Sequence, residues 1–303
     1  MDWPNYLAEA VNSKRELKSS ALIRLSHLSH EEVGDFHQAW QGLQGEERHQ
    51  LLARMVELAE DNFELDFETV FRLGLDGPEP QVKLKAIEGL AESEEPALIP
   101  TLLRLLKQDP EVSVQAAAAI ALGKFVLLVE LDKLHSKQAA YMVDELIAIV
   151  NQPEKSGEVR RRALESLSSL SQPRVWAEIE KAYYSQVFPL KLGSIFAMGK
   201  NHNPRWLGLL LKELSGPQPE MRYEAATACG ESGEMETVPH LLPLLRDKDA
   251  EVQAAAIQAL GQIGGPQSKT ALRHLVQEGG GLLQELAEEA LEELLADEGL
   301  DES

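Results

Sequence analysis

The residues of this sequence that could hold a metal ion are few. His27 and His30 are followed by Glu31 and Glu32, a spacing that could share a metal ion at the end of a helix. Two nearby ligand types do not by themselves make a metal site, so capping of a helix by solvated side chains is the favoured interpretation. We therefore assign no metal ligand.

Candidates for covalent or phosphate chemistry are equally sparse. Cys229 is the only cysteine, which excludes an intramolecular disulfide and favours a reducing compartment. It occupies an apolar slot of the repeat described below, so a buried, inert thiol is predicted. The glycine-rich GQIGGPQ (261–267) could cradle a phosphate, but its place between two repeats favours a turn. No P-loop, nucleophile elbow or zinc-protease motif is present, so we predict a non-enzymatic protein with no catalytic residue and no cofactor.

The charge of the chain limits its partners. Its 303 residues include 50 acidic and 29 basic ones, for a net charge of −21. Such a chain is repelled by nucleic acid and anionic lipid unless a basic patch is segregated. The N-terminus lacks a signal-peptide pattern, and no uninterrupted apolar run approaches membrane-spanning length. We expect a cytoplasmic protein with neither a nucleic-acid nor a membrane partner.

A ten-residue pattern recurs along the chain, best preserved in VQAAAAIALG (114–123) and VQAAAIQALG (252–261). Its first residue, the anchor, is numbered 0. Position +4 is small in most copies and +8 is usually apolar, so 0, +4 and +8 share one face of a helix that a neighbour can approach closely. Glycine at +9 fits a helix stop or a close contact. Steps of 31 or 32 residues, and one of 45, separate the anchors Ser20, Leu51, Val82, Val114, Val159, Leu190, Met221, Val252 and Leu283.

A second helical pattern precedes each anchor, as in Val238, Leu241, Leu242 and Leu245. Proline, glycine and capping residues separate the two patterns, so each repeat is a hairpin of a first and a second helix. Stacked hairpins bury faces that one hairpin cannot. We predict an all-α, right-handed α-solenoid of about nine hairpins. Its expected parts are one solenoid over 1–295, with atypical repeats in 1–60, regular repeats in 61–281, an insertion at 124–138 and an acidic capping helix at 282–295, then a disordered tail at 296–303.

The long step between Val114 and Val159 has two interpretations. The apolar segment 124–138 could extend a second helix and pack on its neighbours. It could instead expose a patch for a partner or a second copy. The packed extension is favoured, since long exposed apolar helices are uncommon in monomers, and a monomer is the favoured oligomeric state.

The segment RDKDAEVQAAAIQALGQIG (246–264) resembles the HEAT-repeat family, and the short period is similar to the repeats of phycobilisome lyases and many bacterial proteins. The resemblance implies an armadillo-like scaffold that binds protein. A phycobilin lyase-like chromophore lyase subunit is an alternative function. A HEAT-like DNA glycosylase is a further one, against which the acidic composition argues.

The resemblance also implies that second helices line the concave side, which makes their non-core positions +1, +2, +3 and +6 the candidate binding surface. Basic and aromatic side chains collect there, and we predict that they bind an acidic or amphipathic protein segment. The alternative is internal charge balance, with a +1 cation paired to a loop aspartate of the adjacent repeat. The candidate partner-binding residues are Lys83, Lys85, Arg160, Arg161, Arg162, Lys191, Phe196, Arg222 and Tyr223.

Overall fold

The computed structural model describes residues 3, 6–7, 22–28, 30–278 and 280–301. Contacts cluster in two compact units, Met1–Phe125 and Val126–Ser303. The single solenoid over 1–295 that the sequence predicts therefore stays a prediction, and each unit is described by itself. The first unit contains α3 (His30–Gly42), α4 (Gly45–Asp61), α5 (Glu68–Gly74), α6 (Pro80–Gly89), η1 (Pro96–Leu98), α7 (Ile99–Gln108) and most of α8 (Val112–Glu130).

The second unit begins within α8 and consists of five hairpins. Some first helices open or close with a 3-10 turn, written η. The elements are α9 (Lys137–Val150), α10 (Gly157–Ser166), α11 (Pro173–Tyr183), α12 (Phe188–Asn201), η2 (Pro204–Trp206), α13 (Leu207–Leu214), α14 (Pro219–Ser232), η3 (Met235–Thr237), α15 (Val238–Leu241), η4 (Leu242–Arg246), α16 (Ala250–Ile263), α17 (Gly265–Glu278) and α18 (Leu282–Asp301).

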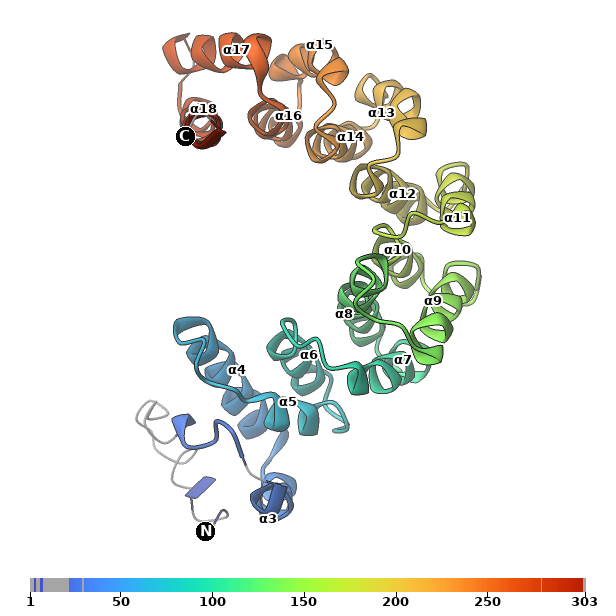
Figure 1. Ribbon diagram of the computed structural model, residues 1–303, viewed down its shortest axis with the longest axis vertical. Coiled ribbons are helices and arrows are strands. Elements are labelled where there is room, and N and C mark those ends of the chain that lie inside the picture. Colours follow the sequence, from blue (N-terminus) through green and yellow to red (C-terminus); the bar gives the residue numbers. More distant parts are fainter. Residues whose placement is uncertain (1–2, 4–5, 8–21, 29, 279, 302–303) are drawn as a thin grey trace. The chain divides into compact units, whose positions relative to one another are not determined.

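The predicted hairpins are confirmed in both units. Eight of them fall between His30 and Asp301, and the one predicted around Ser20 lies largely outside the described residues. None of the described residues belongs to a strand. In the second unit, the second helices α10, α12, α14, α16 and α18 form one layer and the first helices form another (Figure 1). The unit is therefore an all-α solenoid in which consecutive second helices make the most extensive contacts.

The small residue at +4 is the central packing position of the second helices. The seven small residues of this slot are all 0% exposed, which confirms the interpretation of the alanines as close-contact positions. They are Ala86, Ala118, Ala163, Ser194, Ala225, Ala256 and Ala287. The +8 slot is buried as well at Cys229, and burial raises the pKa of its thiol to about 12. An uncharged thiol at neutral pH is chemically inert.

The glycine at +9 is a close-contact position and not a helix stop. The helices α12, α14 and α16 each continue beyond it. A Cβ added at Gly199 would lie 2.6 Å from the Cα of Ala228 in the next second helix. Gly230 faces Ala259 and Gly261 faces Ala290 in the same way, so each glycine opposes the +7 alanine of the following repeat. The absent side chain lets adjacent second helices pack at short range.

The turns within the hairpins follow the breakers in the sequence. Pro219 is the first residue of α14, where its missing N–H costs no helical hydrogen bond. The side chain of Asp249 caps α16 by accepting hydrogen bonds from the backbone N–H groups of Glu251 and Val252. Between repeats, Gly264 and Gly265 have φ of +71° and +83°, so GQIGGPQ forms the turn from α16 into α17 that the sequence favours.

Part of the long step in the repeat is taken up by α8, which at 19 residues is five residues longer than α12, α14 and α16. Phe125, Val126 and Leu128 in its last turns are buried, whereas Leu127 is 44% exposed. In the second unit, the side chain of Glu130 accepts a hydrogen bond from the backbone N–H of Ser171 at 3.0 Å. The end of α8 is thus a packed extension with an exposed edge.

The sequence predicts that no apolar run approaches membrane-spanning length. Because α8 continues to Glu130, that expectation needs correction. Within the described part of the chain, α8 is a helix long and apolar enough to cross a membrane, with a mean hydropathy of 2.0. The helix also carries the repeat slots Val114, Ala118 and Leu122, which are fully buried. Core helices of water-soluble proteins meet the same criterion, so its length and composition are weak evidence for a membrane span.

The C-terminal helix also differs from expectation. Helix α18 continues to Asp301, past the end at residue 295 that the sequence predicts, so the disorder expected at 296–303 is not seen over 296–301. Alanine, leucine and glutamate are good helix formers, which explains why the helix persists where its core contacts end. Residues 302–303 lie outside the described residues.

Candidate protein-binding surface on the second helices

The predicted basic strip is divided between the two units. Lys83 and Lys85 lie on α6 in the first unit, and the remaining candidates lie on α10, α12 and α14 in the second. The contacts of these side chains decide which of them can meet a partner.

Lys83, at +1 of its helix, is buried within the first unit. Its Nζ lies 2.5 Å from Oδ2 of Asp109, in the turn of the following hairpin. Neither side chain is accessible, because both are more than nine-tenths buried. Lys83 therefore joins two repeats and is removed from the candidate surface. Lys85 lies nearby on the same helix, half-buried, with its Nζ 2.6 Å from Glu88 Oε2.

Arg222 makes the equivalent connection in the second unit. Its Nε and NH2 groups donate to the two carboxylate oxygens of Asp247, at 2.7 Å each, in the turn of the next hairpin. Its NH1 donates to the carbonyl of Gly216 in its own hairpin at 3.0 Å. The hydrogen bonds from Arg222 hold the pKa of Asp247 below its usual range. A bidentate, largely buried pair of this kind positions neighbouring repeats.

The other +1 residues bind carbonyl groups of the turns or a neighbouring carboxylate. Arg160 donates through Nε to Val150 O at 2.9 Å, at the end of α9. Gln253 donates in the same way to Asp247 O at 2.6 Å. Lys191 approaches Glu213 Oε1 at 3.7 Å and lies 5.2 Å from the ring centroid of Tyr183. The alternative of a +1 cation paired to a loop aspartate of the adjacent repeat therefore holds for Lys83 and Arg222, whereas Arg160 and Lys191 have other partners within the chain.

The arginines at +2 and +3 of α10 share one carboxylate. Arg161 Nε lies 2.6 Å from Glu165 Oε1, and Arg162 NH1 lies 2.9 Å from Glu165 Oε2. Arg162 also pairs with Glu158 at 2.7 Å. Burial opposes the charge of Arg162, but the two carboxylates outweigh it and raise its pKa. These pairs link successive turns of one helix and leave each arginine side chain partly exposed.

Arg161 also extends across the neighbouring helix. A Cβ at Gly193 of α12 would lie 2.8 Å from Arg161 Cγ, so this glycine leaves the space through which the side chain crosses α12. On the far side, Arg161 NH2 comes within 3.9 Å of Oε2 of Glu224 on α14. Sequence reasoning did not select Glu224. The sequence does contain a signal for it. Arginine at +2 of one repeat is followed by glycine at +3 of the next repeat and by glutamate at +3 of the repeat after that.

A hollow of about 310 Å³ opens beside this crossing, and we call it the second-helix hollow. Tyr223 stands at its edge and is 40% exposed, whereas Glu224 is only 8% exposed. Burial raises the pKa of Glu224 to about 7, against the opposing effect of Arg161. The second-helix hollow is lined by Arg161, Leu192, Pro219, Glu220, Tyr223, Glu224, Asp249 and Glu251.

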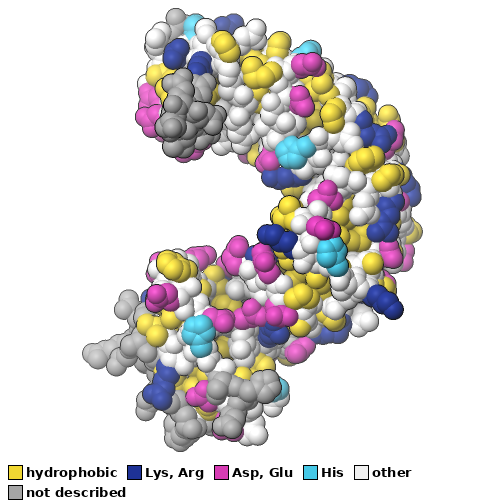
Figure 2. All heavy atoms as spheres, viewed as in Figure 1, with side chains coloured by type: hydrophobic (Ala, Val, Ile, Leu, Met, Phe, Trp, Pro, Cys, Tyr) yellow, Lys and Arg dark blue, Asp and Glu magenta, His cyan; other side chains and the backbone are white. Residues whose placement is uncertain are grey.

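The charge of this surface differs from the prediction. Four of the eight residues that line the second-helix hollow are carboxylic acids and one is an arginine. Over the face of the second unit shown in Figure 2, basic side chains are interspersed with acidic and hydrophobic ones. Phe196 is half-buried on α12 and is not among the residues that line the hollow. Of the predicted residues, Arg161 and Tyr223 are brought together at this site.

Paired helices stacked in two layers define the second unit as an α-solenoid of the kind that presents extended surfaces. The sequence profile of HEAT repeats matches residues 69–136 and 207–292, half of the chain. The chain belongs to the HEAT-repeat family. No curated protein sequence matches it significantly.

Two solved structures agree with this fold at TM-scores above 0.5. A chain in the structure of Kap95p with RanGDP is 12% identical over 96% of this chain and 45% of its own length, with a TM-score of 0.54. Importin beta is 13% identical over 97% of this chain and 47% of its own, with a TM-score of 0.52. YibA of Escherichia coli is 16% identical over 78% of this chain and 95% of its own, with a TM-score of 0.48. This chain thus spans about half the length of the first two.

Proposed function

We propose that the protein is an interaction scaffold and that a segment of a partner protein binds at the second-helix hollow. The observation that carries the proposal is the combination of a half-exposed aromatic ring, Tyr223, with a buried carboxylate, Glu224, at one hollow. Tyrosine in such a position is characteristic of binding hot spots, because it supplies a large contact area at low entropic cost.

The partner segment we propose is amphipathic and carries a cationic side chain. Glu224 makes a 3.9 Å ion pair with Arg161, longer than a hydrogen bond, and its burial disfavours the charged form. A lysine or arginine from a partner would restore the lost solvation of this carboxylate. The acidic partner expected from the basic strip has less support, since Lys83, Arg222 and the α10 arginines are already paired within the chain.

The fold supports a binding role in general terms. Kap95p, whose structure resembles this chain in fold, binds RanGDP. HEAT solenoids use the layer of second helices as an extended surface, and in the second unit that layer carries the hollow.

Affinity capture followed by mass spectrometry tests the proposal when wild type is compared with Tyr223→Ala and Glu224→Gln. We expect at least one protein captured by wild type to be lost from both variants. With that protein purified, Tyr223→Ala should weaken binding by about 2 kcal/mol, roughly thirtyfold, as for a typical aromatic hot spot.

Tyr141→Ala is the matched control, since Tyr141 is a similarly exposed tyrosine on the first helix α9. It should leave the captured set unchanged. Identical capture by wild type, Tyr223→Ala and Glu224→Gln would show that the hollow is not the binding site.

A further inference from the structure

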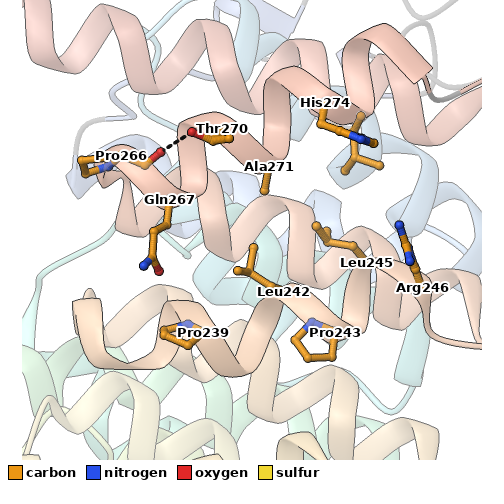
Figure 3. A pocket seen from close by; sticks show the side chains of 11 residues that line it. Pro239, Leu242, Pro243, Leu245, Arg246, Pro266, Gln267, Thr270, Ala271 and His274 are labelled. Atoms are coloured by element: carbon orange, nitrogen blue, oxygen red, sulfur yellow. Dashed lines mark hydrogen bonds between the residues drawn. The ribbon is translucent and has the colours of Figure 1, made fainter.

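A second, larger groove lies on the layer of first helices, between α15 with η4 on one side and α17 on the other (Figure 3). Its volume is about 1060 Å³, above the range usual for small-molecule sites. We call it the first-helix groove. It is lined by Pro239, Leu242, Pro243, Leu245, Arg246, Pro266, Gln267, Thr270, Ala271, His274 and Leu275.

The backbone explains why the groove is open. Pro243 follows the end of α15 at Leu241, and the chain continues as the 3-10 turn η4. On the opposite wall, the small side chain of Ala271 faces the groove (Figure 3). The Thr270 hydroxyl donates to Pro266 O within its own helix at 2.8 Å. At Thr270 and Ala271, the α17 wall therefore sends no large side chain across the gap.

Three other pairs of neighbouring first helices are joined across their surface by ion pairs. Arg174 on α11 lies 2.5 Å from Asp144 on α9, and Arg205 beside α13 lies 3.2 Å from Glu180 on α11. In the first unit, Arg104 on α7 lies 2.6 Å from Asp76, after α5. The first-helix groove contains no acidic side chain that could make such a pair, since none of the described residues lining it is Asp or Glu.

The composition of the groove indicates its occupant. In a chain with 50 acidic residues, the walls combine apolar side chains with Arg246 and His274, which lie toward the same end of the groove (Figure 3). Hydrophobic side chains also gather over α15 and α17 in the surface view (Figure 2). An apolar groove between two helices accepts a third helix through its apolar face, and a cation at one end selects a carboxylate.

We propose that the first-helix groove docks an acidic amphipathic helix of a partner protein. The apolar face of that helix lies on Leu242, Leu245 and Leu275, and one of its carboxylates pairs with Arg246. This site is independent of the second-helix hollow, from which it differs in layer, in charge and in the partner it selects.

A displayed library of random peptides of about 15 residues, roughly four helical turns, is the probe for this proposal. Panning on the full chain should enrich peptides with apolar residues at i, i+3, i+4 and i+7 and with Asp or Glu. Anisotropy measurements with an enriched peptide should then show at least tenfold weaker binding to Ala271→Arg, which fills the groove, and to Arg246→Glu. A peptide with its carboxylate changed to lysine should recover binding to Arg246→Glu.

Ala177→Arg is the matched control, because Ala177 is an exposed alanine on the first helix α11. It should bind the peptide as wild type does, and so should Tyr223→Ala, whatever the outcome for the second-helix hollow. Arg246 is exposed, so its charge reversal tests the groove even if Ala271→Arg fails to fold.

Three results would overturn the proposal. They are the absence of any enriched peptide, the enrichment of basic peptides, and binding that neither groove variant weakens. Light scattering distinguishes a further occupant: a dimer that is lost in Arg246→Glu would show that a second copy of this chain fills the groove, in place of a partner protein.

Discussion

Arg222 and Asp247 lie 25 residues apart in sequence, in consecutive hairpins, and are joined by two hydrogen bonds of 2.7 Å. Lys83 and Asp109, 26 residues apart, form the corresponding pair in the first unit. The residue at +1 of a second helix thus connects neighbouring repeats in both units. The cations of these pairs, Lys83 and Arg222, are residues that the sequence alone suggests for partner binding.

Replacing Arg222 by methionine should destabilise the second unit by about 2–4 kcal/mol, because the largely buried Asp247 would lose its partner. Urea unfolding followed by circular dichroism measures the change. Lys200→Met is the control, since the Lys200–Glu231 pair is partly exposed and should contribute at most about 1 kcal/mol. Equal losses in the two variants would contradict a special role for the Arg222 pair.

The Arg222 pair should also respond to acid. Because Arg222 lowers the pKa of Asp247 in the folded state, the contribution of the pair is complete above the unfolded value of about 3.9 and is lost as the pH falls through the lower folded value. The stability difference between wild type and Arg222→Met should therefore shrink in acid. Unfolding curves at pH 6 and below pH 3 test this, and a constant difference would contradict it.

Glu224 should make the second unit less stable as the pH rises. Its folded-state pKa of about 7 exceeds its ordinary value of 4.5, so the folded state binds more protons between these values and loses stability across that window. Glu224→Gln should match wild type near pH 4 and exceed its stability at pH 8 by about 3 kcal/mol. The exposed Glu220→Gln in the same hollow is the control, and parallel pH profiles for wild type and Glu224→Gln would contradict the prediction.

Gly199→Ala should destabilise the second unit, because the added Cβ would lie 2.6 Å from Ala228 Cα and force α12 away from α14. Such overpacking costs about 1–3 kcal/mol. Gly208→Ala, in α13, has no atom within 4 Å of the new Cβ and should instead be neutral or stabilising by up to about 1 kcal/mol. Thermal unfolding compares the two, and a Tm for Gly199→Ala at or above wild type would contradict the close-contact interpretation.

The packed end of α8 can be tested with two neighbouring leucines. Leu128 is buried and Leu127 is exposed. Leu128→Ala should lower the free energy of unfolding by about 2–5 kcal/mol, whereas Leu127→Ala should change it by no more than about 0.5 kcal/mol. Chemical unfolding of both variants is the measurement. Similar effects of the two substitutions would show that this end of α8 does not belong to the core.

The repeat itself could be predicted because its signal is local. A small residue at +4 and an apolar one at +8 occur in almost every second helix, and their burial at Ala225 and Cys229 follows from helix periodicity alone. The HEAT resemblance in 246–264 rests on the same residues. The predicted end of the last helix at residue 295 was wrong, because good helix formers carry α18 past the end of the repeat pattern to Asp301.

The binding surfaces depended on contacts that a single sequence does not contain. Whether Lys83 faces a partner or Asp109 is decided by how one hairpin stacks on the next, and a side chain pairs with whatever carboxylate that stacking brings near. Glu224 is a candidate because Gly193 leaves room for the Arg161 side chain to cross α12 and approach its carboxylate. The first-helix groove likewise requires the 3-10 turn η4, which contains Pro243, to lie opposite Ala271. The sequence by itself determined the helical repeat, because periodicity acts along one helix, whereas pairing, burial and open space between helices were decided by the tertiary structure.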